Sequence, residues 1–259
     1  MSVPRGQVRC GTLPGRFGPG IQHSDGSISK KHPVIPGFTN INVTSASARY
    51  KYLSPMKLGP FNIVEKRVPL TYYPEGVHPG FVAVNENQQQ ASITNAENWW
   101  QGSKMFQQDV VNGVIQASFF IRRAKMFKDP KPHRRALPKA TAGLPIASYF
   151  DGNVLAYVPS RKNYIDYYGY LVQMRPEFQE LMSRLDNGEN LHIIGFDGYD
   201  PASGLPYGAN PITYTALENA MYYPGRPFGH ELVLCGLLSG IRPWENFDPT
   251  KVTHELGVQ

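Results

Sequence analysis

The strand-like segments of this sequence are few and short, and longer helical patterns separate them. The clearest strand is the apolar run LHIIGF at 191–196, and weaker strand patterns lie at 50–61, 82–84 and 153–158. Apolar residues recur at helical spacing in 94–106, 110–127, 164–185 and 228–238. This mixture predicts an α+β fold, helix-rich around a small mixed sheet, in preference to a regular doubly wound sheet.

The N-terminal residues 1–47 have a different character from the rest of the chain. They are rich in Gly, Pro and Ser and show neither helical nor alternating apolar spacing. We therefore expect an irregular N-terminal arm over 1–47 and one α+β domain over 48–259. No Gly-x-Gly-x-x-Gly motif follows a strand and no Walker loop is found, which argues against a Rossmann unit.

Cysteine usage and hydropathy bear on the compartment. The two cysteines, Cys10 and Cys235, stand far apart and have no neighbouring metal-ligand residues, so neither a disulfide framework nor a zinc site is expected. The first residues lack the apolar region of a signal peptide, and the apolar run 232–238 is too short to cross a bilayer. These features predict a cytoplasmic protein with no membrane partner.

The charge balance points towards an anionic partner. The chain has 26 Lys and Arg against 20 Asp and Glu, which gives a net charge of +6. It also has 15 Tyr, 13 Phe and 3 Trp, a supply of rings for a core or for stacking on a base. A surplus of positive charge favours nucleotides or nucleic acid as partners, although many proteins without such partners have as much.

The segment TNAENWWQGSKMF at 94–106 is the first that can carry chemistry. Glu97, Gln101 and Lys104 are spaced i, i+4 and i+7, so one helical face presents a carboxylate, an amide and an ammonium, and the Trp100 ring flanks that face. A carboxylate in the first helical turn is favoured as the anion. The alternative is structural: Thr94 and Glu97 fit a capping box, and the tryptophans then belong to the core.

The segment 120–139 concentrates positive charge. It holds eight basic residues and a single acid, Asp129. Arginine pairs suit bidentate contacts to phosphate, and a solvated helix end and loop is the alternative. The candidate phosphate ligands are Arg122, Arg123, Arg134, Arg135 and Lys139. The pattern does not separate a nucleotide from a polynucleotide.

Two further segments place polar groups at the ends of predicted elements. Asp197 follows the 191–196 strand in a Gly/Asp turn, where a carboxylate can bind a ribose diol or orient water, although Asp-Gly is also an ordinary turn dipeptide. His230 opens the apolar helix at 228–238, where it can act as an acid-base group or contact a phosphate. A histidine at a helix start is more often structural.

Three short motifs occur in the order YLSP at 52–55, GPF at 59–61 and ENWWQGSK at 97–104, and the apolar helix has a Gly-containing start near 229. Together they resemble the NADAR superfamily, whose members are N-glycosidases associated with NAD and ADP-ribose. Asn98 stands where the family has His, and the basic segment 120–139 is not a family feature. Such departures fit a diverged member, for example from a phage or virus.

The resemblance implies cleavage of an N-glycosidic C1′–N bond in a nucleotide, an ADP-ribosyl group or a modified DNA or RNA. Glu97 would then stabilise positive charge on the ribose, with Asp197 at the ribose or water and His230 at the leaving group. Trp100, Gln101 and Lys104 would contact the substrate, and the basic segment its phosphates. Such chemistry requires no metal and no organic cofactor. Two alternatives remain: a glycosyl or ADP-ribosyl transferase of the same chemistry, and a non-catalytic nucleic-acid-binding protein.

Overall fold

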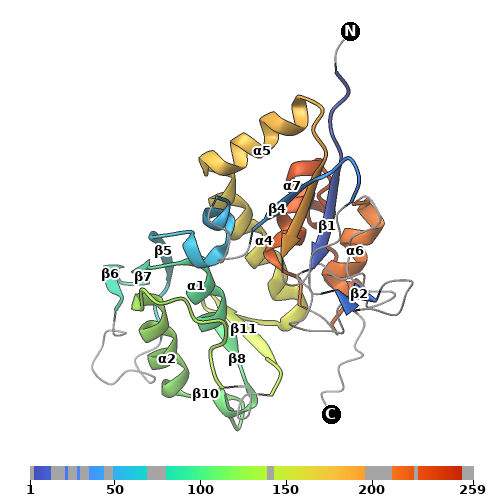
Figure 1. Cartoon of the computed structure of the whole chain (residues 1–259). Helices are drawn as coiled ribbons and strands as arrows, with labels where there is room; N and C mark the ends of the chain where they lie inside the picture. Colours follow the sequence, from blue (N-terminus) through green and yellow to red (C-terminus); the bar gives the residue numbers. More distant parts are fainter. Residues whose placement is uncertain are drawn as a thin grey trace. The chain divides into compact units, whose positions relative to one another are not determined.

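The computed structural model describes residues 3–12, 21–22, 28–29, 35–43, 49–68, 80–138, 143–195, 212–224 and 227–252. The chain divides into two compact units, which are described separately (Figure 1). Unit 1 consists of Met1–Ser54 and Arg161–Gln259, and unit 2 of Pro55–Ser160. Both contain helices around small sheets, so the predicted α+β class is confirmed.

Unit 1 is built on a three-stranded parallel sheet. Its strands are β1 (Val8–Thr12), β13 (Leu191–Gly195) and β4 (Thr39–Asn42), in the order β1-β13-β4. The central strand β13 is buried at all five positions, as the apolar run at 191–196 predicts for a strand with neighbours on both sides. A short antiparallel pair, β2 (Ile21–Gln22) with β3 (Ile28–Ser29), also belongs to this unit.

The N-terminal region differs from the irregular arm predicted for 1–47. Both outer strands of the parallel sheet, β1 and β4, come from it, and Val8, Cys10 and Ile41 are buried. Neither strand has a periodic apolar pattern of its own. They form because β13, about 150 to 180 residues further along the chain, supplies the hydrogen bonds and the apolar surface, so pairing outweighs local propensity.

The helices of unit 1 are α4 (Tyr157–Gln173, whose first four residues are counted in unit 2), α5 (Pro176–Asp186), α6 (Tyr214–Tyr222) and α7 (His230–Ser239). The single helix predicted at 164–185 is two helices, because Pro176 cannot continue a helix and instead occupies the first turn of α5. Gly188, with a φ of +85°, provides the predicted left-handed stop. No helix in the described ranges is both long enough and apolar enough to cross a bilayer.

In its described residues, unit 2 contains three antiparallel sheets and two complete α-helices. The first sheet is β5 (Phe61–Lys66), β7 (Gln88–Ile93) and β6 (Val82–Asn85), and the second is β12 (Asn153–Ala156), β11 (Ala147–Phe150) and β8 (Lys104–Met105). The third is the hairpin of β9 (Val110–Val111) and β10 (Val114–Ile115). The helices are α1 (Ala96–Ser103) and α2 (Ala117–Lys128), which pack together.

Two local predictions within 50–127 are wrong. The helix predicted at 110–127 begins only at Ala117, because Asn112 and Gly113 both adopt positive φ and turn the preceding β-branched residues into a hairpin. The strand predicted at the start of 50–61 is replaced by two short 3-10 turns, Lys51–Leu53 and Pro55–Lys57. Proline cannot donate a ladder hydrogen bond, which disfavours a strand at this point.

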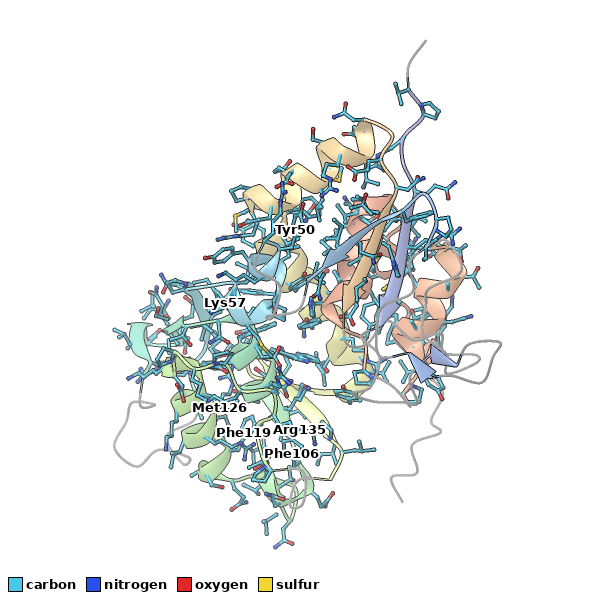
Figure 2. All side chains as sticks on the ribbon, in the orientation of Figure 1. Tyr50, Lys57, Phe106, Phe119, Met126 and Arg135 are labelled. Carbon is cyan, nitrogen blue, oxygen red and sulfur yellow. The ribbon has the colours of Figure 1, made fainter. Side chains whose placement is uncertain are left out.

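The β12-β11-β8 sheet separates two groups of side chains. Met105, Ala147 and Tyr149 form one core cluster with Phe119 and Phe120 of α2 (Phe119 is labelled in Figure 2). Side chains alternate along a strand, so Lys104, Ser148 and Phe150 leave the opposite face. That face is covered by α1, since Trp99 and Trp100 both pack against Phe150.

A buried ion pair ties α2 to the first sheet of unit 2. Arg123 donates from Nη1 and Nη2 to the two carboxylate oxygens of Glu65, each at 2.6 Å, and both side chains are almost fully buried. Gln89 of β7 donates a further hydrogen bond to Glu65. The guanidinium also lies over the Phe127 ring, at 4.6 Å from its centroid.

Removing one partner of this pair should be costly. We expect Glu65→Ala to lower the free energy of unfolding by about 3–5 kcal/mol, because it leaves the Arg123 charge buried without a counterion. Urea denaturation measures the change, with Glu86→Ala, an exposed residue of the β6–β7 turn, as the control. A loss no larger than that of the control would show that water reaches Arg123 and that the pair does not hold α2.

The junction between α5 and β13 in unit 1 rests on Glu189. Its carboxylate accepts hydrogen bonds from Arg184 at 2.6 and 2.7 Å and from the Thr39 hydroxyl at 2.6 Å. The bonds from Arg184, then the one from Thr39, lower the pKa of Glu189 to about 2. Because the folded pKa is depressed, the stabilisation is complete above the unfolded value near 4.5 and is lost as the pH falls through about 2.

The titration of Glu189 is therefore a direct check on this contact. Carboxyl ¹³C NMR should give a midpoint near pH 2 in the native protein, and Arg184→Gln should move it upward towards 4.5. Arg242→Gln is the control. It removes an arginine that follows α7 in the sequence, and the Glu189 midpoint should not change. A native midpoint near 4.5 would contradict the Arg184–Glu189 contact.

Candidate active site

The N-terminus of α1 is capped differently from the sequence prediction. Asn95 is the N-cap, and its side chain accepts a hydrogen bond from the backbone N–H of Asn98 at 2.9 Å. Thr94 instead donates its hydroxyl to the backbone oxygen of Asp129. The predicted Thr94–Glu97 capping box is thus wrong, because the helix begins one residue later. Glu97 lies at the second helical position, partly exposed, and accepts a hydrogen bond from Gln101 Nε2 at 2.9 Å.

Trp100 is enclosed by other aromatic side chains. Its ring stacks with Phe150 at a centroid distance of 6.1 Å and with Tyr157 at 6.4 Å. Only 7% of the residue is exposed. This leaves too little ring surface for a base to stack on, so the base-stacking role predicted for Trp100 is corrected to a wall of the aromatic cluster.

The basic segment 120–139 is divided between internal and exposed positions. Arg122 makes a two-pronged ion pair with Asp109, with both N–O distances at 2.7 Å, and Arg123 is the buried partner of Glu65. Their predicted phosphate-binding roles are therefore wrong, because carboxylates of the same chain already hold both guanidinium groups. Arg134 and Arg135 are exposed, and Figure 2 labels Arg135. Lys139 lies outside the described residues.

Asn98 anchors the loop that leads to these two arginines. Its buried side chain donates from Nδ2 to the backbone oxygens of Asp129 at 2.8 Å and Lys131 at 3.0 Å. Its Oδ1 accepts the backbone N–H of His133 at 2.7 Å. Residues 129–133 are thus fixed beside the first turn of α1. They are held there by Asn98, which is the next residue after Glu97.

The same loop contains a histidine–carboxylate pair that the sequence analysis missed. His133 Nε2 lies 2.6 Å from Asp129 Oδ2, and both side chains are about one-third exposed. The hydrogen bond from His133, then one from the backbone of Lys131, lowers the pKa of Asp129. Asp129 and His133 are four residues apart, with Pro130 between them. This spacing is too common in sequences to have predicted the pair.

His230 belongs to unit 1, in a second cluster of polar groups. It opens α7 and is buried, with Nε2 at 3.3 Å from the backbone oxygen of Val43 and Nδ1 at 3.3 Å from Glu231 Oε2. Its ring makes an edge contact with Tyr168, whose hydroxyl donates to the backbone oxygen of Leu53. Burial, followed by the charge of Glu231, raises the pKa of Tyr168.

This second cluster lies at the carboxyl ends of the parallel strands of unit 1, where α/β folds commonly bind ligands. Val43 directly follows β4, and Gly195 ends β13. A Cβ atom at Gly195 would lie 2.4 Å from Glu231 Oε1, so only glycine at this position leaves room for the Glu231 side chain. Asp197, the predicted ribose or water ligand, comes two residues after Gly195 and lies outside the described residues.

The predicted site residues therefore fall into two groups. Glu97, Trp100, Gln101 and Lys104 come together along α1 of unit 2, next to the loop that presents Arg134 and Arg135. His230 is placed in unit 1. The described residues contain no group of three or more His, Cys, Asp or Glu side chains arranged to hold a metal ion.

Comparison with known proteins gives no relative for this chain. No protein-family model, no curated protein and no solved structure matches it. The resemblance to the NADAR superfamily thus stays a prediction from the motifs, and the functional argument rests on the geometry of the site.

The anchoring role of Asn98 can be tested directly. We expect Asn98→Ala to lower the free energy of unfolding by about 2–3 kcal/mol, because three partly buried backbone groups lose their partner. It should also speed hydrogen exchange of the His133 amide, which mass spectrometry or NMR can follow. Asn87→Ala, at an exposed turn position, is the matched control. Unchanged exchange at His133 would contradict the anchor.

Proposed function

We propose that the chain is an N-glycosidase-type enzyme acting on the C1′–N bond of a nucleotide-like or ADP-ribosyl substrate. The observation that carries the proposal is the position of Glu97. Its carboxylate is not used as a helix cap, is partly exposed, and stands beside a cationic loop that Asn98 fixes in place.

The chemistry needs a carboxylate in such a position. As the C1′–N bond lengthens, positive charge develops on the ribose ring, and an anionic oxygen close to the ring lowers the energy of that state. Gln101 donates to one oxygen of Glu97 and so limits the orientations of the carboxylate. The base leaves with the electrons of the C1′–N bond and takes up a proton, while a water molecule adds to C1′ and gives up a proton.

The loop after α2 supports the recognition and protonation steps. Arg134 and Arg135 are exposed and can meet a phosphate, whereas Arg123 is buried and Arg122 is largely enclosed beside Asp109. His133, held by Asp129, is a group that can donate a proton to the departing base. These roles support hydrolysis and transfer to another acceptor equally, so a transferase of the same chemistry remains within the proposal.

A second candidate, a non-catalytic nucleic-acid-binding protein, is favoured by one observation. Five basic side chains on the second half of α2 and the loop after it are exposed: Lys125, Lys128, Lys131, Arg134 and Arg135. Such a surface gives affinity for any polyanion, and that affinity falls steeply with salt. It requires no contribution from Glu97.

The test is release of base by purified protein. We expect free base to appear, by mass spectrometry, from one member of a panel of nucleotides, NAD and ADP-ribosylated oligonucleotides. Glu97→Gln should reduce turnover by at least about 100-fold, because the amide keeps the shape but not the charge. Glu86→Gln is the control of equal charge change.

The two candidates predict opposite outcomes. Turnover that survives Glu97→Gln would contradict the role of Glu97. No released base from any substrate, together with salt-sensitive oligonucleotide binding that is equal in both variants, would replace the enzyme proposal with the binding protein.

A further inference from the structure

The α1 face of the β12-β11-β8 sheet contains two polar side chains among rings. Lys104 of β8 and Ser148 of β11 are direct partners in the antiparallel register, so both side chains leave the same face (Figure 1 shows α1, β8 and β11 together). Phe150, two residues after Ser148, shares that face and packs against Trp100. The pair therefore lies in the aromatic cluster described above.

Lys104 is a largely buried residue whose ammonium has no counterion among the described residues. The residue is 9% exposed, and within the described part of the chain no carboxylate lies within ion-pair distance of its Nζ. Its neighbours are the Trp100 ring, with the centroid at 5.0 Å, and the Tyr157 ring, at 5.8 Å. Cation–π contacts recover only part of the cost of removing an ammonium from water.

The hydroxyl of Ser148 is also unsatisfied. The residue is fully buried, and its Oγ has no hydrogen-bond partner in the described structure. Buried hydroxyl groups are nearly always hydrogen-bonded, because leaving one unpaired costs stability. Two adjacent polar groups without acceptors, one of them a cation, are what a site for an anionic oxygen presents when it is empty.

We propose that Lys104 and Ser148 form an oxyanion subsite that takes a phosphoryl group of the substrate. The ammonium can only donate, so its ligand must be an acceptor, and a negative charge offsets the cost of burying Lys104. A phosphoryl group has several oxygens, which lets it accept from the ammonium and the hydroxyl at once. The nature of the substrate rests on the proposed function, whereas the subsite rests on this sheet face alone.

The alternative is that Lys104 only packs against the Trp100 and Tyr157 rings and stabilises their positions. The two roles have opposite consequences for the ligand-free protein. If the ammonium awaits an anion, its replacement by an apolar chain of similar length removes an uncompensated charge from a largely buried position and stabilises the fold. If the lysine instead stabilises the positions of Trp100 and Tyr157, the same replacement destabilises the fold.

The experiment measures binding and stability together, with inorganic phosphate as the probe. Isothermal titration and tryptophan fluorescence follow binding, because Nζ lies against the Trp100 ring. Lys104→Met should weaken phosphate binding at least about tenfold and raise the melting temperature by about 2–4 °C. Ser148→Ala should weaken binding and leave stability unchanged or higher. Lys57→Met, an exposed lysine labelled in Figure 2, is the control that should alter neither.

Defined results overturn the proposal. The proposal is wrong if the native protein shows no saturable phosphate binding. It is also wrong if Ser148→Ala binds phosphate as tightly as the native protein does, and this variant decides the question if Lys104→Met fails to fold. A less stable Lys104→Met that still binds phosphate also overturns the proposal. Acetate at equal ionic strength tests the ligand class, and acetate binding as tight as phosphate binding would overturn the phosphoryl assignment.

Failure here is distinguishable from failure of the glycosidase proposal. Glu97→Gln should keep phosphate binding while losing turnover, and Lys104→Met should lose phosphate binding. Phosphate binding that depends on Lys104, in a protein that releases no base, leaves the subsite and removes the reaction. Base release with no Lys104-dependent binding leaves the reaction and removes the subsite.

Discussion

The buried pair of Arg123 and Glu65 is the interaction on which the arrangement of unit 2 depends. It fixes α2 against β5 and β7, and α2 in turn determines where the loop 129–133 begins. Asn98 then holds that loop against the first turn of α1, one residue from Glu97. The position of the exposed arginines relative to the candidate carboxylate is therefore set by two buried polar contacts, because a loop of this composition has no apolar anchor of its own.

The sequence predicts elements whose pattern is local and misses those that depend on a distant partner. Strand β13 and helices α1 and α7 are recognisable because their apolar spacing and end signals lie within a few residues. Strands β1 and β4 are not, since their burial comes from β13. The basic segment shows the same limit: Arg122 and Arg123 look like ligands in one dimension, but the acids that neutralise them are 13 and 58 residues away.

The candidate site was predictable in part for the same reason. The contact of Glu97 with Gln101 follows from helical spacing and is present on α1, whereas Lys104 is the extended C-cap of the helix and lies against the Trp100 and Tyr157 rings. No sequence pattern indicates a role for Ser148, Asn98 or the His133–Asp129 pair, because the role of each depends on the residues that the fold places next to it. The unsatisfied Ser148 hydroxyl breaks the rule that buried polar groups are hydrogen-bonded, and proteins retain such departures chiefly where a ligand completes them.

The polarity of α1 gives the two proposed contacts a common physical basis. A carboxylate in the first turn and an ammonium just past the last turn both lie where the helix dipole favours their charge, although the dipole does not replace a counterion for Lys104. Seven residues separate Glu97 from Lys104, a rise of about 10 Å along the helix. A ligand that meets both must therefore be extended and must have its anionic group at one end and its reacting carbon towards the other. A nucleotide has that form, whereas a free base has neither the length nor the charge.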